Sequence, residues 1–350
     1  MTAQRNQRKS ATKKTEQHPF KIFRVPPKGF DARKASNREL LRHGIPKQPS
    51  AQTHPRLWLQ WEQIAQRQPR FVEPVFERAK RFRRSKIRDH RSLLDVIPTP
   101  VRPYYTSWVQ RLIDSGASII GLLLPETSNN WCGGYVSQPA TETLRVVSGQ
   151  WTVPSVTPPP SAWTGTNYID GQYTCLVWVG IDGWKVSSDV LQAGTLSRVT
   201  VSGGKITGTT YYVWTEWFGS PWIVQSLAVS PGDLIFCTVC APFENTHGTA
   251  MFTNLSTNES VNYGIDAPAG TTLSGNVAEW ITEDPGQLSG GLFPFPNFGQ
   301  VQFSQCTAGS KTVELDLLDS KMIDLVDASN SVRAEALYQN RSALRCSFVK

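Results

Sequence analysis

The side chains of this chain that are best suited to catalysis are a carboxylate and a carboxamide in two separate apolar segments. Glu279 lies in Asn276-Val-Ala-Glu-Trp-Ile-Thr-Glu-Asp284, and Gln192 lies in Val190-Leu-Gln-Ala-Gly194. A carboxylate can take a proton from water as a general base. An amide N–H can stabilise the oxygen that becomes negative during the attack. If the fold brings the two together, they form a hydrolytic site that needs no metal, serine or histidine.

Other kinds of catalytic group are scarce in the second part of the chain. Its only histidine is His247, in the turn-like Asn245-Thr-His-Gly248, so Ser-His-Asp and Cys-His arrangements would depend on that one residue. Cys237 and Cys240 have metal-ligand spacing, but on an extended strand their thiols point to opposite faces, and no second pair follows. There is no P-loop and no dinucleotide fingerprint. We therefore expect no metal and no cofactor.

The acids around Glu279 follow the spacing of a strand. Val277, Glu279, Ile281 and Glu283 share one face, which places the two glutamates about 13 Å apart along the strand. An acid among apolar neighbours is costly to bury unless it is paired or functional. The pattern alone leaves two interpretations open, a functional carboxylate or a solvated face whose acids keep the protein soluble.

Charge divides the chain in two. Residues 1–125 hold 26 Lys+Arg and 9 Asp+Glu, a net of +17, and the remaining residues hold 10 and 19, a net of −9, which sum to the overall +8. Such asymmetry predicts a basic extension attached to an acidic body. Its densest basic cluster comprises Arg81, Arg83, Arg84, Lys86, Arg88 and Arg91. The extension could bind nucleic acid or a membrane surface, could act as an inhibitory prosegment that the acidic body attracts, or could be solvated.

We predict that residues 1–125 form this extension, which is partly helical, partly disordered and a possible prosegment. Residues 1–19 lack apolar periodicity, and frequent prolines afterwards permit only short helices. The patterns predict helices over Asn37–His43, after a capping serine, and over Val75–Phe82. No apolar h-region of a signal peptide follows the amino terminus, and no apolar stretch is long enough to span a membrane.

Residues 126–350 read as one all-β domain. Short segments rich in Val, Thr, Trp, Tyr and Phe are bounded by turn residues, without alternating helices, which predicts an antiparallel two-sheet β-sandwich. Only Ser329–Tyr338 suggests a helix. The predicted strands are Leu144–Val153, Cys175–Ile181, Thr209–Phe218, Trp222–Val229, Asp233–Ala241, Val277–Glu283, Gln300–Cys306 and Ala343–Val349.

This domain resembles the glutamic peptidases, the eqolisin or G1 family, over residues 129–306. Each matching motif is weak alone, but seven in the family's order form a specific signal. They are Asn129-Asn-Trp-Cys-Gly-Gly134, Val147-Ser-Gly-Gln-Trp-Thr-Val-Pro154, Trp178-Val-Gly-Ile-Asp-Gly183, Val190-Leu-Gln-Ala-Gly194, Trp214-Thr-Glu-Trp-Phe218, Val229-Ser-Pro-Gly-Asp233 and Ala278-Glu-Trp-Ile-Thr-Glu-Asp284. The resemblance implies a concanavalin A-like sandwich with the active site on the concave face of one sheet.

The resemblance also implies the residues of the site. The family's catalytic Glu, in its Ala-Glu-Trp motif, maps onto Glu279. For the catalytic Gln, a gapless count places Ser187 at the first Gln position of the family and Gln192 at the second. We assign the role to Gln192, and a degraded site is the alternative. The residues expected to support the pair are Asp182, Glu216, Trp178 and Trp131.

The function implied is that of an acid-active, metal-independent endopeptidase whose partner is a protein or peptide substrate. One alternative is a non-catalytic, lectin-like sandwich that binds carbohydrate or peptide. Another is a glycoside hydrolase that pairs Glu279 with Glu283 or Glu216. We expect a monomer without a nucleic-acid partner. The sequence predicts a cytoplasmic protein whose six cysteines are reduced and buried, whereas the family resemblance implies an extracellular one.

Overall fold

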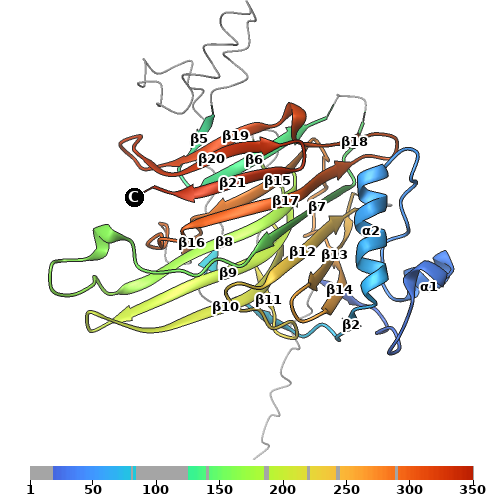
Figure 1. Ribbon diagram of the computed structural model, residues 1–350, viewed down its shortest axis with the longest axis horizontal. Coiled ribbons are helices and arrows are strands. Elements are labelled where there is room, and N and C mark those ends of the chain that lie inside the picture. Colours follow the sequence, from blue (N-terminus) through green and yellow to red (C-terminus); the bar gives the residue numbers. More distant parts are fainter. Residues whose placement is uncertain are drawn as a thin grey trace, which may run out of the picture.

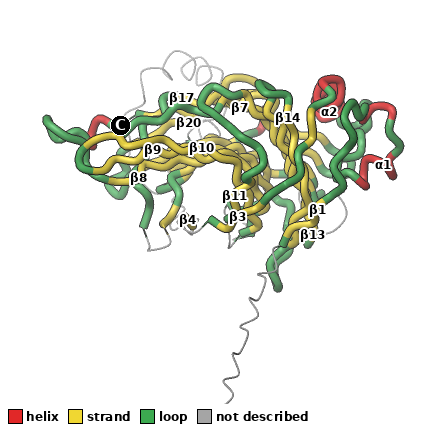
Figure 2. The backbone as a smooth tube through the Cα atoms, turned by 90° about the horizontal axis from the view of Figure 1, so that it is seen from below, coloured by secondary structure: helices red, strands yellow, loops and turns green. Residues whose placement is uncertain are grey.

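The computed structural model describes residues 19–79, 82–83, 125–138, 142–184, 189–218, 221–241, 245–287 and 291–349. Two layers of mainly antiparallel strands lie face to face, and the two α-helices lie at one side of them (Figures 1 and 2). The mostly antiparallel β-fold predicted from the strand pattern is confirmed. Within the described ranges, no helix combines the length and apolar character needed to span a membrane.

The first sheet draws strands from the extension as well as from the body. In spatial order its main strands are β1 (Phe20–Ile22), β14 (Glu259–Asp266), β13 (His247–Asn254), β12 (Leu234–Cys240), β7 (Val146–Thr152) and β17 (Gln300–Gly309). β2 (Arg70–Phe71) runs parallel to β14, and β18 (Glu314–Leu315) pairs with the end of β17.

The second sheet is wider and carries most of the site motifs. In spatial order its strands are β3 (Phe76–Arg78), β11 (Trp222–Val224), β10 (Lys205–Trp217), β9 (Leu191–Ser202), β8 (Gly171–Ile181), β15 (Val277–Glu283), β6 (Trp131–Ser137), β19 (Lys321–Val326), β20 (Val332–Asn340) and β21 (Ala343–Phe348). β5 (Glu126–Ser128) runs parallel to β19, and β4 (Phe82–Arg83) pairs with β16 (Gly286–Gln287) in a separate ribbon.

Strand β17 belongs to both sheets. Its residues Gln300–Phe303 pair with β21 in the second sheet, and the later part of the strand pairs with β7 in the first. Between these parts the register shifts, and Gln305 adopts a φ of 53°. An extra residue of this kind bends a strand sharply, which lets one strand pass from one layer to the other.

Alternation along the strands fills two apolar clusters, one on each face of the second sheet. Val177 and Val179 point into the core between the sheets, where the indole of Trp151 donates to the Thr195 hydroxyl at 3.0 Å. Trp178, between the two valines, belongs to the cluster on the opposite face. Buried apolar residues therefore lie on both faces of the second sheet.

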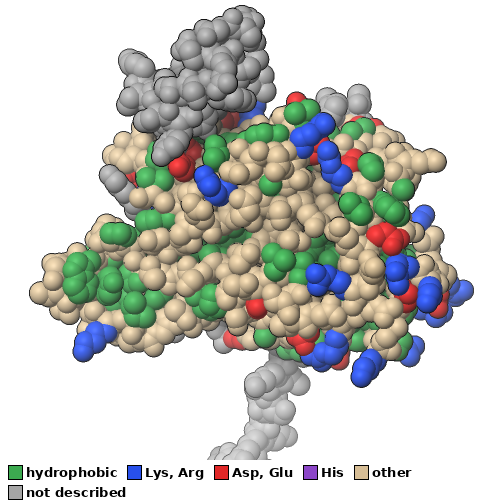
Figure 3. Space-filling view, viewed as in Figure 1, with side chains coloured by type: hydrophobic (Ala, Val, Ile, Leu, Met, Phe, Trp, Pro, Cys, Tyr) green, Lys and Arg blue, Asp and Glu red, His purple; other side chains and the backbone are tan. Residues whose placement is uncertain are grey.

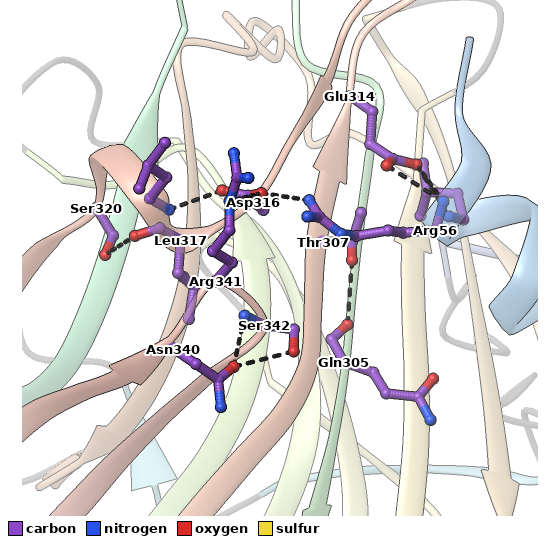
Figure 4. A network of polar contacts seen from close by, with 12 residues as sticks. Arg56, Gln305, Thr307, Glu314, Asp316, Leu317, Ser320, Asn340, Arg341 and Ser342 are labelled. Carbon is purple, nitrogen blue, oxygen red and sulfur yellow. Dashed lines mark hydrogen bonds and ion pairs between the residues drawn. The ribbon is translucent and has the colours of Figure 1, made fainter. Parts of the chain in front are cut away.

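The extension is built into the sandwich. Helix α1 (Asn37–Arg42) starts with the predicted capping box of Ser36 and Glu39. Helix α2 (Pro55–Arg67) packs against the outer side of the first sheet, where Arg56 forms an ion pair with Asp316 and donates its main-chain N–H to Glu314 (Figure 4). On the face shown in Figure 3, Lys and Arg side chains lie mainly at the side formed by these helices. Among the described residues, short 3₁₀ helices span Ala32–Lys34, Pro160–Ala162 and Leu317–Asp319.

Two of the predicted helices are wrong. Val75–Phe82 forms the short strands β3 and β4, because its alternating residues pair with β11 and β16 at the sheet margins. Ser329–Tyr338 forms most of β20, in which Ala334 and Ala336 are buried at a period of two. Helix α2 and strands β9, β13, β14 and β19 were not predicted, and β11 ends at Val224 rather than at Val229. The domain boundary at residue 126 stays a prediction.

Candidate active site

Strand register places five residues in one row across the second sheet, which we call the site row. Glu279 of β15 lies directly opposite Tyr135 of β6 and Gly180 of β8. Gly180 lies opposite Gln192 of β9, which lies opposite Glu216 of β10. Directly opposed residues of antiparallel strands point to the same face of a sheet. The acid, the amide and a second acid therefore share one surface, although their segments are far apart in the sequence.

Gly180 separates the two side chains predicted to be catalytic. Because adjacent strands lie about 4.8 Å apart, the Cα atoms of Glu279 and Gln192 are about 10 Å from each other. A Cβ atom at Gly180 would lie 2.9 Å from the ring of Trp178 and 3.1 Å from the Cβ of Gln192. A side chain at this position would therefore collide with Trp178 and Gln192, so only glycine fits between the acid and the amide.

A neighbouring turn holds the buried carboxylate of Glu279. Oε1 of Glu279 accepts the main-chain N–H of Trp184 at 2.9 Å. The turn begins at Asp182, whose φ of 65° is left-handed and whose two carboxylate oxygens each accept a main-chain N–H at 2.7 Å, from Gly275 and Asn276. Burial raises the pKa of Asp182, and these N–H groups oppose that rise. Asp182 thus supports the site by fixing the backbone beside Glu279.

The amide of Gln192 is oriented by Glu216. Its Nε2 donates to Oε2 of Glu216 at 2.9 Å, and both side chains are buried. A primary amide carries two N–H groups. One of them binds Glu216, and the other can donate to a further acceptor on the same face. Glu216 therefore lies in contact with Gln192, and its supporting role stays a prediction.

Tryptophan rings surround the acid end of the site row. Trp178 donates its indole N–H to Oε2 of Glu283 at 2.8 Å. The Trp131 ring lies at right angles to that of Trp178, with centroids 4.9 Å apart, and stacks on that of Trp184 at 5.7 Å. These rings keep the surroundings of Glu279 apolar, which strengthens electrostatic interactions there. All six residues predicted for the site thus lie in the site row or in contacts next to it.

Sequence reasoning missed Glu126, Tyr135 and Trp184. The Trp184 indole donates to Oε2 of Glu126 at 2.9 Å, and the Tyr135 hydroxyl donates to Oε1 of Glu126 at 3.1 Å. Burial and the nearby Glu126 carboxylate raise the pKa of Tyr135. The one available signal was the position of Trp184 directly after a site motif, since the pairing of β5 and β6 with β19 has no local signature.

The other candidate groups lie away from the site row. His247 is exposed and contacts Asp266, with its Nδ1 2.6 Å from the Asp266 Oδ1. Cys237 and Cys240 are buried, and burial raises the pKa of Cys240 to about 12. In the described part of the chain, no three or more His, Cys, Asp and Glu side chains are grouped so that they could hold a metal ion. Ser187, the other glutamine position considered, lies outside the described residues.

Two further buried acids lie beside the segments that carry the site. Burial raises the pKa of Asp189 to about 6, opposed by a 2.7 Å hydrogen bond from the indole of Trp217. Burial raises the pKa of Asp284 to about 8, opposed by Arg333, whose Nη1 lies 2.7 Å from the carboxylate. Both acids therefore retain a proton to higher pH than a free aspartic acid does.

Comparison with known protein families identifies relatives of the sandwich. The model of the Peptidase A4 family matches residues 129–348. The chain is 31% identical over 200 residues to aspergillopepsin-2 of Aspergillus niger, an alignment covering 54% of this chain and 67% of that protein. The family match includes the whole site row and extends beyond residue 306, where the motif resemblance ends.

Solved structures with the same fold are also peptidases. Scytalido-glutamic peptidase, in complex with a transition state analog inhibitor, matches with a TM-score of 0.53 and 24% identity, covering 63% of this chain and 98% of that one. SCP-B, a member of the eqolisin family in complex with the tripeptide Ala-Ile-His, matches with a TM-score of 0.50 and 25% identity at the same coverage. The concanavalin-like sandwich expected from the motifs is therefore confirmed.

Proposed function

Because the chain belongs to the Peptidase A4 family of glutamic peptidases, we propose that Glu279 and Gln192 are the pair with which it hydrolyses peptide bonds. The site row is the observation that carries this proposal. Its register turns the carboxylate and the amide to the same face, with only a glycine between them. Side chains on opposite faces of the sheet could not have acted on one substrate.

The two side chains have complementary parts in the reaction. Ionised Glu279 takes a proton from a water molecule, and the oxygen of that water attacks the carbonyl carbon of the scissile bond. The N–H of Gln192 that does not bind Glu216 donates to the carbonyl oxygen as it becomes negative. Protonated Glu279 then gives its proton to the leaving amine, which restores the carboxylate. A carboxylate base remains competent at pH values where histidine is already protonated, so we propose activity at acidic pH.

Digestion of a denatured protein at pH 2–5 tests this assignment with Glu279→Gln and Gln192→Ala beside the wild type. Loss of the oxyanion donor in Gln192→Ala should lower the rate about a hundred- to a thousandfold. Loss of the general base in Glu279→Gln should lower it by at least about a hundredfold. Glu73→Gln and Gln66→Ala, at exposed positions in the extension, are matched controls that should keep the wild-type rate.

Two outcomes would change the assignment. Cleavage that persists in both site variants would remove Glu279 and Gln192 from the catalytic role. Absence of cleavage at every pH, with binding of sugars or peptides retained, would favour the lectin-like alternative.

The glycoside hydrolase alternative fits the geometry less well. Paired carboxyl groups in such enzymes lie about 5–5.5 Å or about 6.5–9.5 Å apart. Glu283 is four residues from Glu279, about 13 Å along the strand, and accepts the Trp178 indole. Glu216 is three strands from Glu279, about 14 Å across the sheet, and binds Gln192. Both acids are already paired, which favours a single general base.

We also propose that the extension keeps the site closed. Glu279 and Gln192 are each 0% exposed in the full chain. Ala79 of the extension is buried in the same cluster as Trp131 and Trp178, and β4 of the extension pairs with β16, directly after β15. A substrate can reach the pair only after a covering contact has opened.

Time courses of the full chain at pH 3–4 test this closure. Peptidase activity should appear after a lag, and mass spectrometry should show a cut in the extension during that lag. Preincubation in high salt at neutral pH should shorten the lag seen at pH 3–4 if attraction between the basic extension and the acidic body contributes. Immediate activity from the intact chain would contradict the proposal.

A further inference from the structure

A carboxylate outside the proposed catalytic pair is linked to that pair through one tryptophan. Oε2 of Glu126 accepts the indole N–H of Trp184 at 2.9 Å, and the main-chain N–H of the same Trp184 donates to Oε1 of Glu279 at 2.9 Å. The proposed general base and Glu126 therefore hold the same residue, one through its backbone and the other through its side chain.

The ring of Trp184 is confined by two aromatic neighbours. It stacks on Trp131, with centroids 5.7 Å apart, and lies against Tyr135 at 5.8 Å. Trp184 is 1% exposed. A buried indole whose N–H has a fixed acceptor has few orientations available, because any rotation would leave that donor unpaired. The position of its backbone N–H is restricted as a result.

Glu126 is itself anchored on a strand. It lies opposite Ile323 in the parallel pairing of β5 with β19, and its Oε1 accepts the hydroxyl of Tyr135 at 3.1 Å. The ammonium group of Lys321 lies 3.8 Å from the same oxygen. Glu126, which anchors Trp184, therefore lies on a strand paired with β19, and β19 in turn pairs with β6, the strand of Tyr135.

We propose that Glu126 is a positioning residue for the general base, an inference that rests on the proposed function of Glu279. Asp182 fixes the start of the turn that approaches Glu279, and Glu126 fixes its end by holding the Trp184 indole. The Trp184 N–H then gives the Glu279 carboxylate one orientation while it exchanges a proton with water. Small displacements of groups that position reactants have large effects on rate.

Steady-state kinetics at acidic pH, measured after the lag of the full chain has ended, test the proposal with Glu126→Ala, Trp184→Phe, the double variant and Glu126→Gln. Each single loss should lower kcat about ten- to a hundredfold with KM unchanged. The double variant should lose no more, since both changes break one link. Glu126→Gln keeps an acceptor for the indole and should recover most of the rate. Lys321→Met is the matched control, because it removes a partner of Glu126 but not the bond to Trp184.

Two further measurements separate positioning from a purely structural role. The acid limb of the kcat/KM profile should move to higher pH in Trp184→Phe, which keeps the charge of Glu126, because a weaker N–H contact stabilises the Glu279 carboxylate less. Hydrogen exchange of the Trp184 amide should become faster in Glu126→Ala but not in Lys321→Met.

Additive losses in the double variant, or losses confined to KM or to thermal stability, would overturn the positioning role. If the wild type cleaves and Glu279→Gln does not, while Glu126→Ala and Trp184→Phe keep the wild-type kcat, only the positioning role fails. If the wild type does not cleave at all, the proposed function fails and the positioning role falls with it.

Discussion

At the scale of single residues, the site depends on an absent side chain as much as on the two polar ones. Gly180 lies between Glu279 and Gln192 in register, and the Trp178 ring and the Gln192 Cβ pack where its side chain would be. The identities of Glu279 and Gln192 could be inferred from sequence, because a carboxylate and an amide are chemically distinctive. The role of Gly180 could not, because it depends on which strands become neighbours.

Gly180→Ala should therefore damage catalysis more than stability. The added methyl group would meet the Trp178 ring at 2.9 Å and the Gln192 Cβ at 3.1 Å, so one of them must move. We expect about a ten- to a hundredfold loss of kcat/KM from the displaced amide, with about 1–3 kcal/mol of destabilisation from overpacking. Gly208→Ala, also in a strand of the second sheet, is the control, because a Cβ there meets nothing within 4 Å. Equal rates for the two variants would argue against a spatial role for Gly180.

At the scale of elements, the extension completes the open side of the sandwich. β1 adds to β14 in the first sheet, and β3 adds to β11 in the second. Between them, Phe20 and Phe76 stack with centroids 3.7 Å apart, and Trp222 and Tyr263 meet the Phe20 ring edge-on. Covered edges protect a sheet from pairing with other chains. The extension thus stabilises the fold with the same strands that lead toward the site.

Phe20→Ala tests this stabilising role. Removing a buried aromatic ring should cost about 3–5 kcal/mol in the free energy of unfolding, measured by chemical denaturation. Ile22→Ala on the same strand is the control, because Ile22 is 46% exposed and should change stability by less than about 0.5 kcal/mol. A Phe20 variant as stable as the Ile22 variant would show that the aromatic contact is dispensable.

The element scale is also where sequence reasoning was least accurate. Strands with bulky residues at a period of two, such as Val277–Glu283, were predicted with correct bounds. Val75–Phe82 has residues that fit a helical face, yet pairing at two sheet margins makes it extended. Helix α2 was missed because proline-rich flanks obscured a start signal that Pro55 itself provides at the first helical position. In each case long-range pairing or packing decided the structure.

At the scale of the whole molecule, buried acids make stability depend on pH. An acid whose pKa is higher in the folded state than in the unfolded state binds more protons when folded. Its contribution to the free energy of unfolding is therefore present at low pH. That contribution is lost as pH rises from the pKa of the acid in the unfolded state through its pKa in the folded state. For Asp284 this window runs from its ordinary value of 3.8 to about 8, and for Asp189 it ends at about 6.

The melting temperature should therefore be higher at pH 5 than at pH 8. Asp284→Asn should make stability depend less on pH, because an amide does not ionise. The difference in the free energy of unfolding between pH 5 and pH 8 should shrink by on the order of 1 kcal/mol or more. Asp319→Asn, at an exposed position, is the control and should leave the pH dependence unchanged. A wild-type protein that melts at a higher temperature at pH 8 would contradict the sign derived from these two acids.

Strand β17 has a mechanical consequence for the two layers. Gln300–Phe303 forms hydrogen bonds in one sheet, and the rest of the strand forms them in the other. One continuous strand therefore links the two layers. Separating the two layers at β17 would break inter-strand hydrogen bonds in both sheets. The sandwich is therefore held closed along this strand. Opening should be easier at the far margin, where β1 and β3 belong to different layers and the Phe20 and Phe76 rings stack between them. The two layers should therefore separate first at the margin of the sandwich that the extension covers.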